Sequence, residues 1–291
     1  MQFSIGNTPI KELQTEKGIF VKEEYKNPTG SIKDRTAFFM IAHAISRGVL
    51  KKGGKVVEAS SGNTGIGLAY AGKEFGVAVT IVMPDFVSSE KIMLIKALGG
   101  KVVLTDGSRG MNGAISVAKM IARKEGAFIP DQFSNPANTL AHKFGTGPEI
   151  LNQMQFKVQS FVAGVGTGGT IMGTGLVLKE FNPFVKIIAV EPEESPVLSG
   201  GKPGIHTIEG IGAGFVPKIF DRSIISEVIK IPQEEAWNEA LRLCKEDGIC
   251  GGPSTGANVL ASRIIKKKYH LSRVITIAPD GISRYLSEFR I

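Results

Sequence analysis

Cysteine and histidine are scarce in this chain, which argues against a metal-centred protein. The 291 residues include two cysteines and four histidines. Cys244 and Cys250 have neither the two-residue spacing of a redox motif nor a partner pattern for zinc, and the histidines are dispersed. We therefore predict no metal site, and we expect both cysteines to be buried or half-buried free thiols of a reducing compartment.

Long apolar runs are also missing. No run reaches membrane-spanning length, and residues 1–4 (MQFS) lack the basic region and the long apolar core of a signal peptide. No internal repeat or low-complexity tract interrupts the chain. These observations predict a cytoplasmic protein without a membrane partner.

The chain is basic, with a formal net charge of +8. The basic residues are scattered and form no stripe with interleaved aromatic residues, so we do not expect nucleic-acid binding. The one run, residues 266–268 (KKK), is predicted to lie late on a helix, where cations complement the helix dipole. A positive field would also attract anionic small molecules.

Composition and periodicity predict an α/β protein. Hydrophobic residues make up 42% and charged residues 21%, which is ordinary for a globular chain, and the length favours two domains. Short runs rich in valine and isoleucine alternate with helical patterns, which predicts two open twisted parallel sheets flanked by helices. The expected strands include residues 55–59, 79–82, 102–104, 161–163, 187–190 and 274–277. We place the domain boundary near residues 135–139.

Residues 27–35 (NPTGSIKDR) place a lysine where a turn passes into an amphipathic helix. Lys33 is a candidate nucleophile that forms a Schiff base. A lysine at a helix start is most often an ordinary solvated residue. The functional interpretation therefore depends on whether anion-binding loops occur elsewhere in the chain.

Two such loops are present, each between an expected strand and an expected helix. Residues 60–67 (SSGNTGIG) precede a helix expected over 68–75, and residues 164–170 (GVGTGGT) precede one expected over about 171–181. Such a loop directs backbone N–H groups and the positive end of a helix dipole at one point. Either loop alone is also compatible with an ordinary tight turn. Neither a Walker A loop nor a clean dinucleotide fingerprint is present, which leaves a small phosphorylated cofactor and a lysine nucleophile, as pyridoxal 5′-phosphate requires.

Several motifs in order resemble those of the cysteine synthase (O-acetylserine sulfhydrylase) group of the cysteine synthase/cystathionine β-synthase family. The resemblance runs nearly end to end, through residues 5–10, 27–35, 61–65, 132–138, 146–150, 166–170 and 210–217. It implies the fold of fold-type-II pyridoxal-phosphate enzymes, similar to the tryptophan synthase β chain, and pyridoxal 5′-phosphate as the cofactor.

The resemblance also implies roles for individual residues. Lys33 would bind the cofactor covalently, Asn63 would bind the ring hydroxyl, and Ser254 would face the pyridine nitrogen. From the residues alone, Ser254 would rather cap a helix that starts near Ala257. The cofactor phosphate would be bound by Gly166, Thr167, Gly168, Gly169 and Thr170, and the substrate α-carboxylate by Ser60, Ser61, Asn63, Thr64 and Gln132.

For the domains, the resemblance implies an N-terminal domain of residues 1–137 and a C-terminal domain of residues 138–291 that binds the cofactor phosphate. About the first 33 residues would cross into the C-terminal sheet, and residues 77–122 would form a mobile lid. A homodimer, and a complex with a serine acetyltransferase, are further expectations from the resemblance.

The expected reaction is β-replacement of the acetate of O-acetyl-L-serine by sulfide, which gives L-cysteine. Ala213, Gly214 and Phe215 are the cysteine-synthase form. Glu209 and residues 250–252 are more like cystathionine β-synthase, which uses serine and homocysteine, and O-phosphoserine is a further possible donor. A regulatory scaffold that binds the cofactor without turnover is the non-enzymatic alternative. Retention of Lys33 with the binding residues counts against it.

Overall fold

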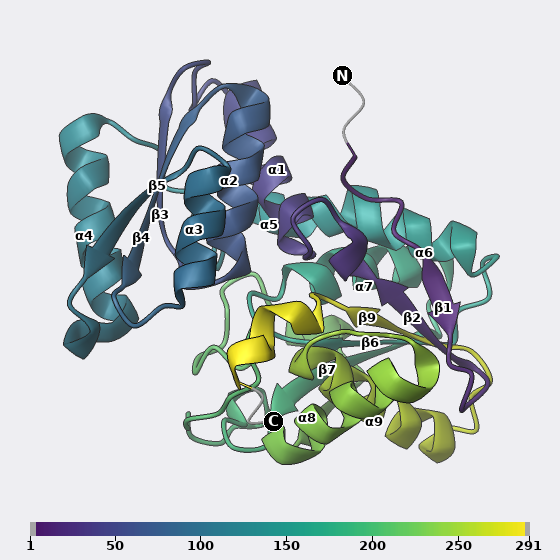
Figure 1. The fold of residues 1–291 in the computed structure, drawn as a ribbon. Helices are drawn as coiled ribbons and strands as arrows, with labels where there is room; N and C mark the ends of the chain where they lie inside the picture. The colour runs from purple at the N-terminus through teal and green to yellow at the C-terminus, as the bar shows by residue number, and fades with distance from the viewer. Residues whose placement is uncertain (1–3, 289–291) are drawn as a thin grey trace. The chain divides into compact units, whose positions relative to one another are not determined.

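The computed structural model describes residues 4–288 of the chain, which form two compact units (Figure 1). The smaller unit is Lys33–Ala141. The larger unit combines the segment up to Ile32 with the segment that starts at His142. Whether the units are independent folding domains, and whether residues 77–122 move as a lid, stays a prediction.

The smaller unit is a three-stranded parallel sheet covered by helices on both faces (Figure 1). Helices α2 and α3 lie against one face, α4 lies against the other, and α1 packs on α2. The strands are β3 (Lys55–Ala59), β4 (Ala78–Pro84) and β5 (Lys101–Thr105), and the helices are α1 (Lys33–Ser46), α2 (Asn63–Phe75), α3 (Ser89–Ala97), α4 (Gly110–Glu125) and α5 (Pro136–Ala141).

Strand β3 shows why this sheet is buried on both faces. Successive side chains of a strand point to opposite faces. Val56 therefore packs with Met40 and Ile66 from α1 and α2, whereas Val57 packs with Ala114 and Ala118 from α4. A continuous apolar run of this kind is typical of a parallel strand between two helical layers.

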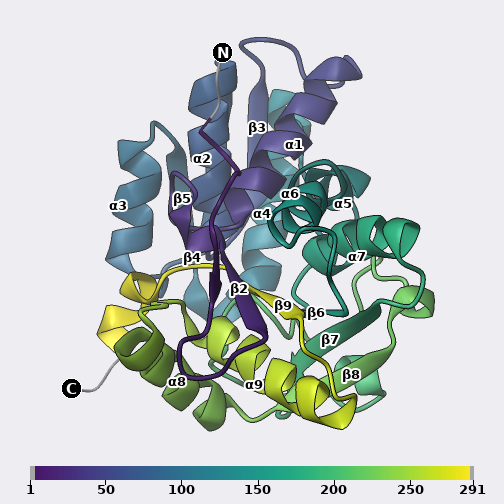
Figure 2. The same cartoon turned by 90° about the vertical axis from the view of Figure 1, so that its right-hand side faces the viewer.

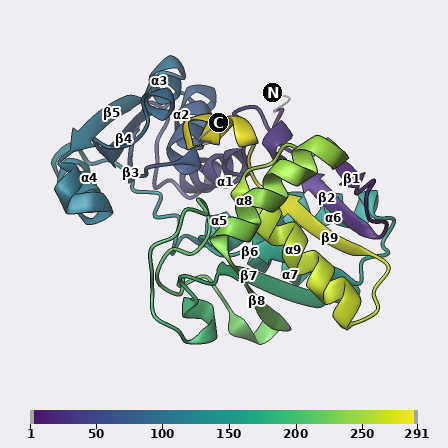
Figure 3. The ribbon, with the colours of Figure 1, turned by 60° about the horizontal axis from the view of Figure 1, so that its bottom comes forward.

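The larger unit contains a six-stranded sheet in the order β1-β2-β9-β6-β7-β8, most of which can be followed in Figure 2. Helices α8 and α9 cover one face, and α6 and α7 cover the other (Figure 3). The strands are β1 (Ile10–Glu12), β2 (Ile19–Glu23), β6 (Ser160–Gly164), β7 (Lys186–Pro192), β8 (Glu227–Ile231) and β9 (Val274–Ala278), and the helices are α6 (Gly147–Gln153), α7 (Gly169–Phe181), α8 (Gln233–Arg242) and α9 (Pro253–Lys268).

Alternate residues again supply the two cores. Phe161 packs with Ile171 of α7, while its neighbour Val162 packs with Ala257 and Ile265 of α9. The strand pairs are parallel except at one edge, where β1 pairs antiparallel with β2. The predicted parallel sheets are thus confirmed, with one antiparallel pair added at this edge, because the short connection from β1 to β2 allows only a hairpin.

The prediction of free thiols is wrong. Cys244 and Cys250 form a disulfide with a Cα–Cα distance of 4.1 Å. Cys244 lies in a π-helical turn, Leu243–Asp247, and Gly248 then takes a positive φ of 62°. This reversal, which the sequence spacing does not reveal, brings the two sulfur atoms together. The three lysines at 266–268 do form the last turn of α9, as predicted.

Candidate functional site

Lys33 is the first residue of α1 and is half-buried. Helix α1 buries one face, which includes Ala37, Met40 and Ile41, and this fixes its start against α2. The two helices approach closely at Gly67, where an added Cβ would lie 2.8 Å from the carbonyl oxygen of Lys33. A glycine at this crossing therefore sets the position of the backbone at Lys33.

The polar loop at residues 60–64 connects β3 to α2 and wraps around a buried serine. The Ser60 hydroxyl accepts hydrogen bonds from the N–H groups of Gly65 (3.1 Å) and Gly62 (3.4 Å). Thr64 donates to the side-chain oxygen of Gln132 at 2.7 Å. Ser61 and Asn63 are half-buried beside them in sequence. The structure thus brings Gln132 to the loop, as the predicted substrate site requires.

A carboxylate that the sequence analysis did not single out lies beside this loop. Glu58, in β3, is 7% exposed and accepts hydrogen bonds from the N–H groups of Asp131 (2.8 Å) and Ala59 (3.1 Å). Burial raises the pKa of its carboxyl group to about 7, and the negative charge of Asp131 adds to this effect. The available signal was a charged residue between the apolar residues Val57 and Ala59.

The glycine loop of the larger unit, residues 164–170, connects β6 to α7. Gly168 precedes the first residue of α7 and has a φ of 89°, which glycine adopts without a Cβ clash. At Gly166 an added Cβ would lie 2.0 Å from the Gly210 carbonyl oxygen. Thr167 is buried, and the N-terminus of a 13-residue helix follows. This backbone can bind an anion closely.

His142 is a second residue that sequence reasoning missed. It is 1% exposed, and its Nε2 lies 3.3 Å from the Thr170 hydroxyl of the glycine loop. Its Nδ1 lies 2.9 Å from the Thr146 hydroxyl. His142 and Thr146 are the ends of a π-helical turn, His142–Thr146, so the imidazole connects this turn to the loop. Dispersal of the four histidines in the sequence concealed this contact.

Ser254 is 2% exposed and lies in the first turn of α9, after Gly252 as the N-cap residue and Pro253 as the first helical residue. The alternative in which Ser254 caps a helix starting near Ala257 is therefore wrong. Asn258, one turn later, accepts from Gly164 N (2.7 Å) and donates to Ile277 O (2.8 Å). These bonds hold the start of α9 beside the ends of β6 and β9.

The predicted residues thus form two sets. Lys33, the loop at 60–64 and Gln132 belong to the smaller unit, and the glycine loop with Ser254 belongs to the larger one. Each set, taken by itself, fits a part of pyridoxal 5′-phosphate. The glycine loop of the larger unit can hold a phosphate at the start of a helix, and the smaller unit offers a half-buried lysine.

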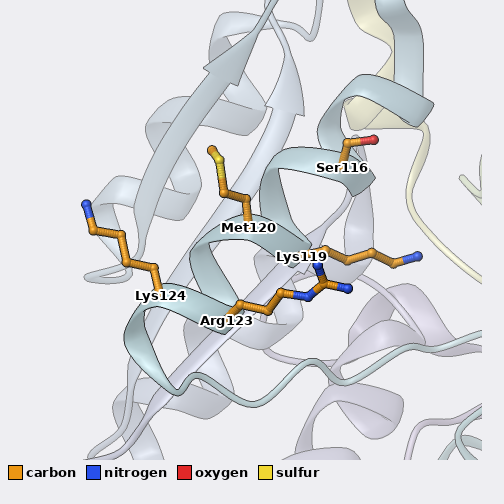
Figure 4. Close-up of a pocket in the computed structure, with 5 residues that line it drawn as sticks. All are labelled: Ser116, Lys119, Met120, Arg123 and Lys124. Atoms are coloured by element: carbon orange, nitrogen blue, oxygen red, sulfur yellow. The ribbon is translucent and has the colours of Figure 1, made fainter.

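Other features of the described residues offer no competing centre. A hollow of about 550 Å³ lies on α4, and Figure 4 shows that its five lining side chains all come from that helix. None of the predicted site residues lines it. Within residues 4–288 no group of three or more potential metal ligands occurs. No helix in the same range combines the length and apolarity needed to cross a membrane.

The chain is similar to known proteins in both sequence and structure. The family model for "Pyridoxal-phosphate dependent enzyme" matches residues 1–280. A cysteine synthase of Staphylococcus aureus is 45% identical over 292 residues, covering 97% of this chain and 94% of that protein. The crystal structure of a cysteine synthase from Entamoeba histolytica has a TM-score of 0.94 at 44% identity and covers 98% of this chain and 88% of its own. An O-acetylserine dependent cystathionine β-synthase from Helicobacter pylori has a TM-score of 0.90 at 37% identity, with coverages of 98% and 95%.

Proposed function

Because the chain belongs to the family of pyridoxal-phosphate dependent enzymes, we propose that it is a cysteine synthase that converts O-acetyl-L-serine and sulfide to L-cysteine and acetate. The family assignment confirms the resemblance, the fold class and the cofactor expected from the sequence. The observation that supports this reaction most directly is the 45% identity to a cysteine synthase over nearly the full length of both chains.

Each set of residues has a part in the proposed reaction. Lys33 would bind the cofactor covalently, and the backbone N–H groups of residues 166–170 would bind its phosphate. Asn63 would bind the ring hydroxyl, and the neutral Ser254 hydroxyl would be the partner of the ring nitrogen. The loop at residues 60–64 and Gln132 bind the substrate α-carboxylate. The cofactor supplies the electron sink that makes the Cα proton acidic.

The Lys33 amine is the acid–base group of this scheme. As a neutral amine, Lys33 would take the Cα proton of the substrate. Acetate leaves from Cβ, sulfide forms the new carbon–sulfur bond there, and Lys33 returns the proton to Cα. A neutral serine as the partner of the ring nitrogen would favour prompt loss of the β-substituent.

Replacement of Lys33 tests both the reaction and the residue. The wild-type holoenzyme should form cysteine from O-acetyl-L-serine and sulfide, and Lys33→Ala should lower the rate by roughly 10²–10⁴-fold because the general base is lost. Borohydride reduction followed by peptide mapping should locate the pyridoxyl group on Lys33. Recovery of the label on another lysine would refute this role.

Cystathionine formation is the second candidate, favoured by Glu209 and by the likeness to the Helicobacter pylori enzyme. A second amino acid needs partners for its own ammonium and carboxylate, and Glu209 offers one for the ammonium. A panel that crosses O-acetylserine, O-phosphoserine and serine with sulfide and homocysteine separates the candidates. We expect the largest kcat/KM for O-acetylserine with sulfide, since acetate leaves with little acid assistance.

A homodimer in the cytoplasm is the remaining part of the proposal. Phe156 and Phe181 are 51% and 52% exposed, and their rings lie 5.2 Å apart between centroids, a pair suited to an interface. Sedimentation of the purified protein should give the mass of a dimer, and Phe181→Lys should shift it toward the monomer. Binding of a serine acetyltransferase stays a prediction from the family.

A further inference from the structure

Glu58 is a buried carboxylate with no role in the scheme above. It lies one residue from the end of β3, after the core residues Val56 and Val57, and is 7% exposed. Burying an ionisable group in an apolar strand is costly unless its oxygens are hydrogen-bonded. Both oxygens of Glu58 accept a backbone N–H, so the contacts of this side chain indicate what it holds in place.

The Glu58 side chain accepts the next hydrogen bond at the point where the backbone pairing of β3 with Phe128 ends. Along β3, Phe128 N donates to Lys55 O and Val57 N donates to Phe128 O, both at 2.9 Å. Pro130 has no N–H and cannot continue this pairing. The next N–H, of Asp131, instead donates to the Glu58 side chain at 2.8 Å. The carboxylate thus attaches the segment after Pro130 to the end of the strand.

That segment has an unusual backbone. Asp131 has a φ of +48°, a left-handed conformation that non-glycine residues adopt uncommonly and at an energetic cost. Its carbonyl oxygen accepts from Ser134 N (3.1 Å) and Asn135 N (2.9 Å), so the turn starts at this residue. The hydrogen bond to Glu58 therefore stabilises a conformation that the chain does not favour by itself.

The two residues that donate to Glu58 each precede a predicted substrate ligand. Ala59 precedes Ser60, and Asp131 precedes Gln132. Gln132 then accepts from Thr64 at 2.7 Å. The Glu58 carboxylate therefore sets the spacing between the two segments that form the predicted site for the substrate carboxylate. Thr64 and Gln132, which join these segments, are 68 residues apart in sequence.

We infer that Glu58 is a positioning residue for the substrate α-carboxylate, acting through the backbones of Ala59 and Asp131 without touching the substrate. This inference rests on the proposed function. Because these loops bind the carboxylate in the ground state and the transition state alike, loosening them weakens substrate binding more than it slows turnover.

The test is steady-state kinetics of purified holoenzymes with O-acetyl-L-serine and sulfide. In Glu58→Gln an NH₂ group replaces one acceptor oxygen, and KM for O-acetyl-L-serine should rise about tenfold or more, with kcat changed by less than about threefold. Glu58→Asp keeps the charge but withdraws the oxygens by about 1.5 Å, the length of one carbon–carbon bond. It should show the same rise in KM if hydrogen-bond position matters.

Glu191→Gln is the matched control. Glu191 is 1% exposed and also accepts two backbone N–H groups, from Leu198 (2.7 Å) and Ser199 (3.1 Å), outside the predicted site. Its KM should stay at the wild-type value. An unchanged KM in Glu58→Gln, or a wild-type KM in Glu58→Asp, overturns the inference while the proposed function stands.

Two further outcomes also decide the question. If both Glu58 variants fail to fold, judged by circular dichroism and cofactor content, while Glu191→Gln folds, Glu58 is a core structural residue and the inference is wrong. If the wild-type enzyme forms no cysteine, the proposed function fails, and this inference fails with it.

Discussion

Replacing Glu58 by glutamine should change how the stability of the protein depends on pH. The pKa of this carboxyl group is raised from 4.5 to about 7 in the folded protein, mainly by burial. Between these values the folded state keeps a proton that the unfolded state releases, so the free energy of unfolding falls as pH rises. At 1.36 kcal/mol for each pKa unit, the loss is about 3 kcal/mol when complete above pH 7.

The figure of about 3 kcal/mol needs no reduction for solvent screening, because the Glu58 side chain is only 7% exposed. Glutamine does not titrate, so other groups cancel when wild type and Glu58→Gln are compared. The wild-type free energy of unfolding should fall by about 2–3 kcal/mol more than that of the variant between about pH 5 and pH 8.

Denaturant unfolding followed by circular dichroism, in several buffers across this range, measures the difference directly. The expected result is that the wild-type free energy of unfolding minus that of the variant falls with rising pH, with a midpoint between the unfolded and folded pKa values. Parallel curves would refute the reasoning, because they would mean that Glu58 has the same pKa in both states.

Two further predictions concern the larger unit. Gly166→Ala should weaken binding of pyridoxal 5′-phosphate by about tenfold or more, since the new Cβ would lie 2.0 Å from the Gly210 carbonyl oxygen and must displace the loop. Gly204→Ala is the control, because its new Cβ would lie 2.1 Å from the Glu194 carbonyl oxygen, outside the predicted site. Cofactor titration of this control should give the wild-type affinity. Replacing both Cys244 and Cys250 by serine should lower the free energy of unfolding by about 2 kcal/mol, the loop-closure entropy expected for so short a loop. A reductant should cause the same loss in the wild-type protein. Equal stability of the two proteins in oxidising buffer would contradict this prediction.

Local sequence patterns were sufficient for most strands. Residues 55–59 were predicted as a strand and form β3 with these bounds, because a short run with adjacent valines between turn residues favours a strand buried in a parallel sheet. Strand β8 was not predicted. Its residues, Glu227–Ile231 (EVIKI), form an edge strand that includes charged side chains, which is a weaker pattern.

Helix starts were less well predicted. Helix α2 begins at Asn63 and α7 at Gly169, whereas the sequence indicated starts near residues 68 and 171. In both cases small residues occupy the first turn, and glycine has a low intrinsic helix propensity. Packing overrides that propensity, since the close approach of α2 to the backbone of Lys33 at Gly67 is possible only without a side chain.

By itself the sequence determined the α/β class, the two loops that begin helices, and the family motifs with Lys33. Those features depend on local periodicity, turn chemistry and ordered motifs, which are properties of neighbouring residues. Only the tertiary structure decided that Cys244 pairs with Cys250, that Gln132 meets Thr64, and that Glu58 holds Asp131. These contacts depend on how turns reverse the chain and on which distant backbone groups need partners when buried, and no local pattern encodes either.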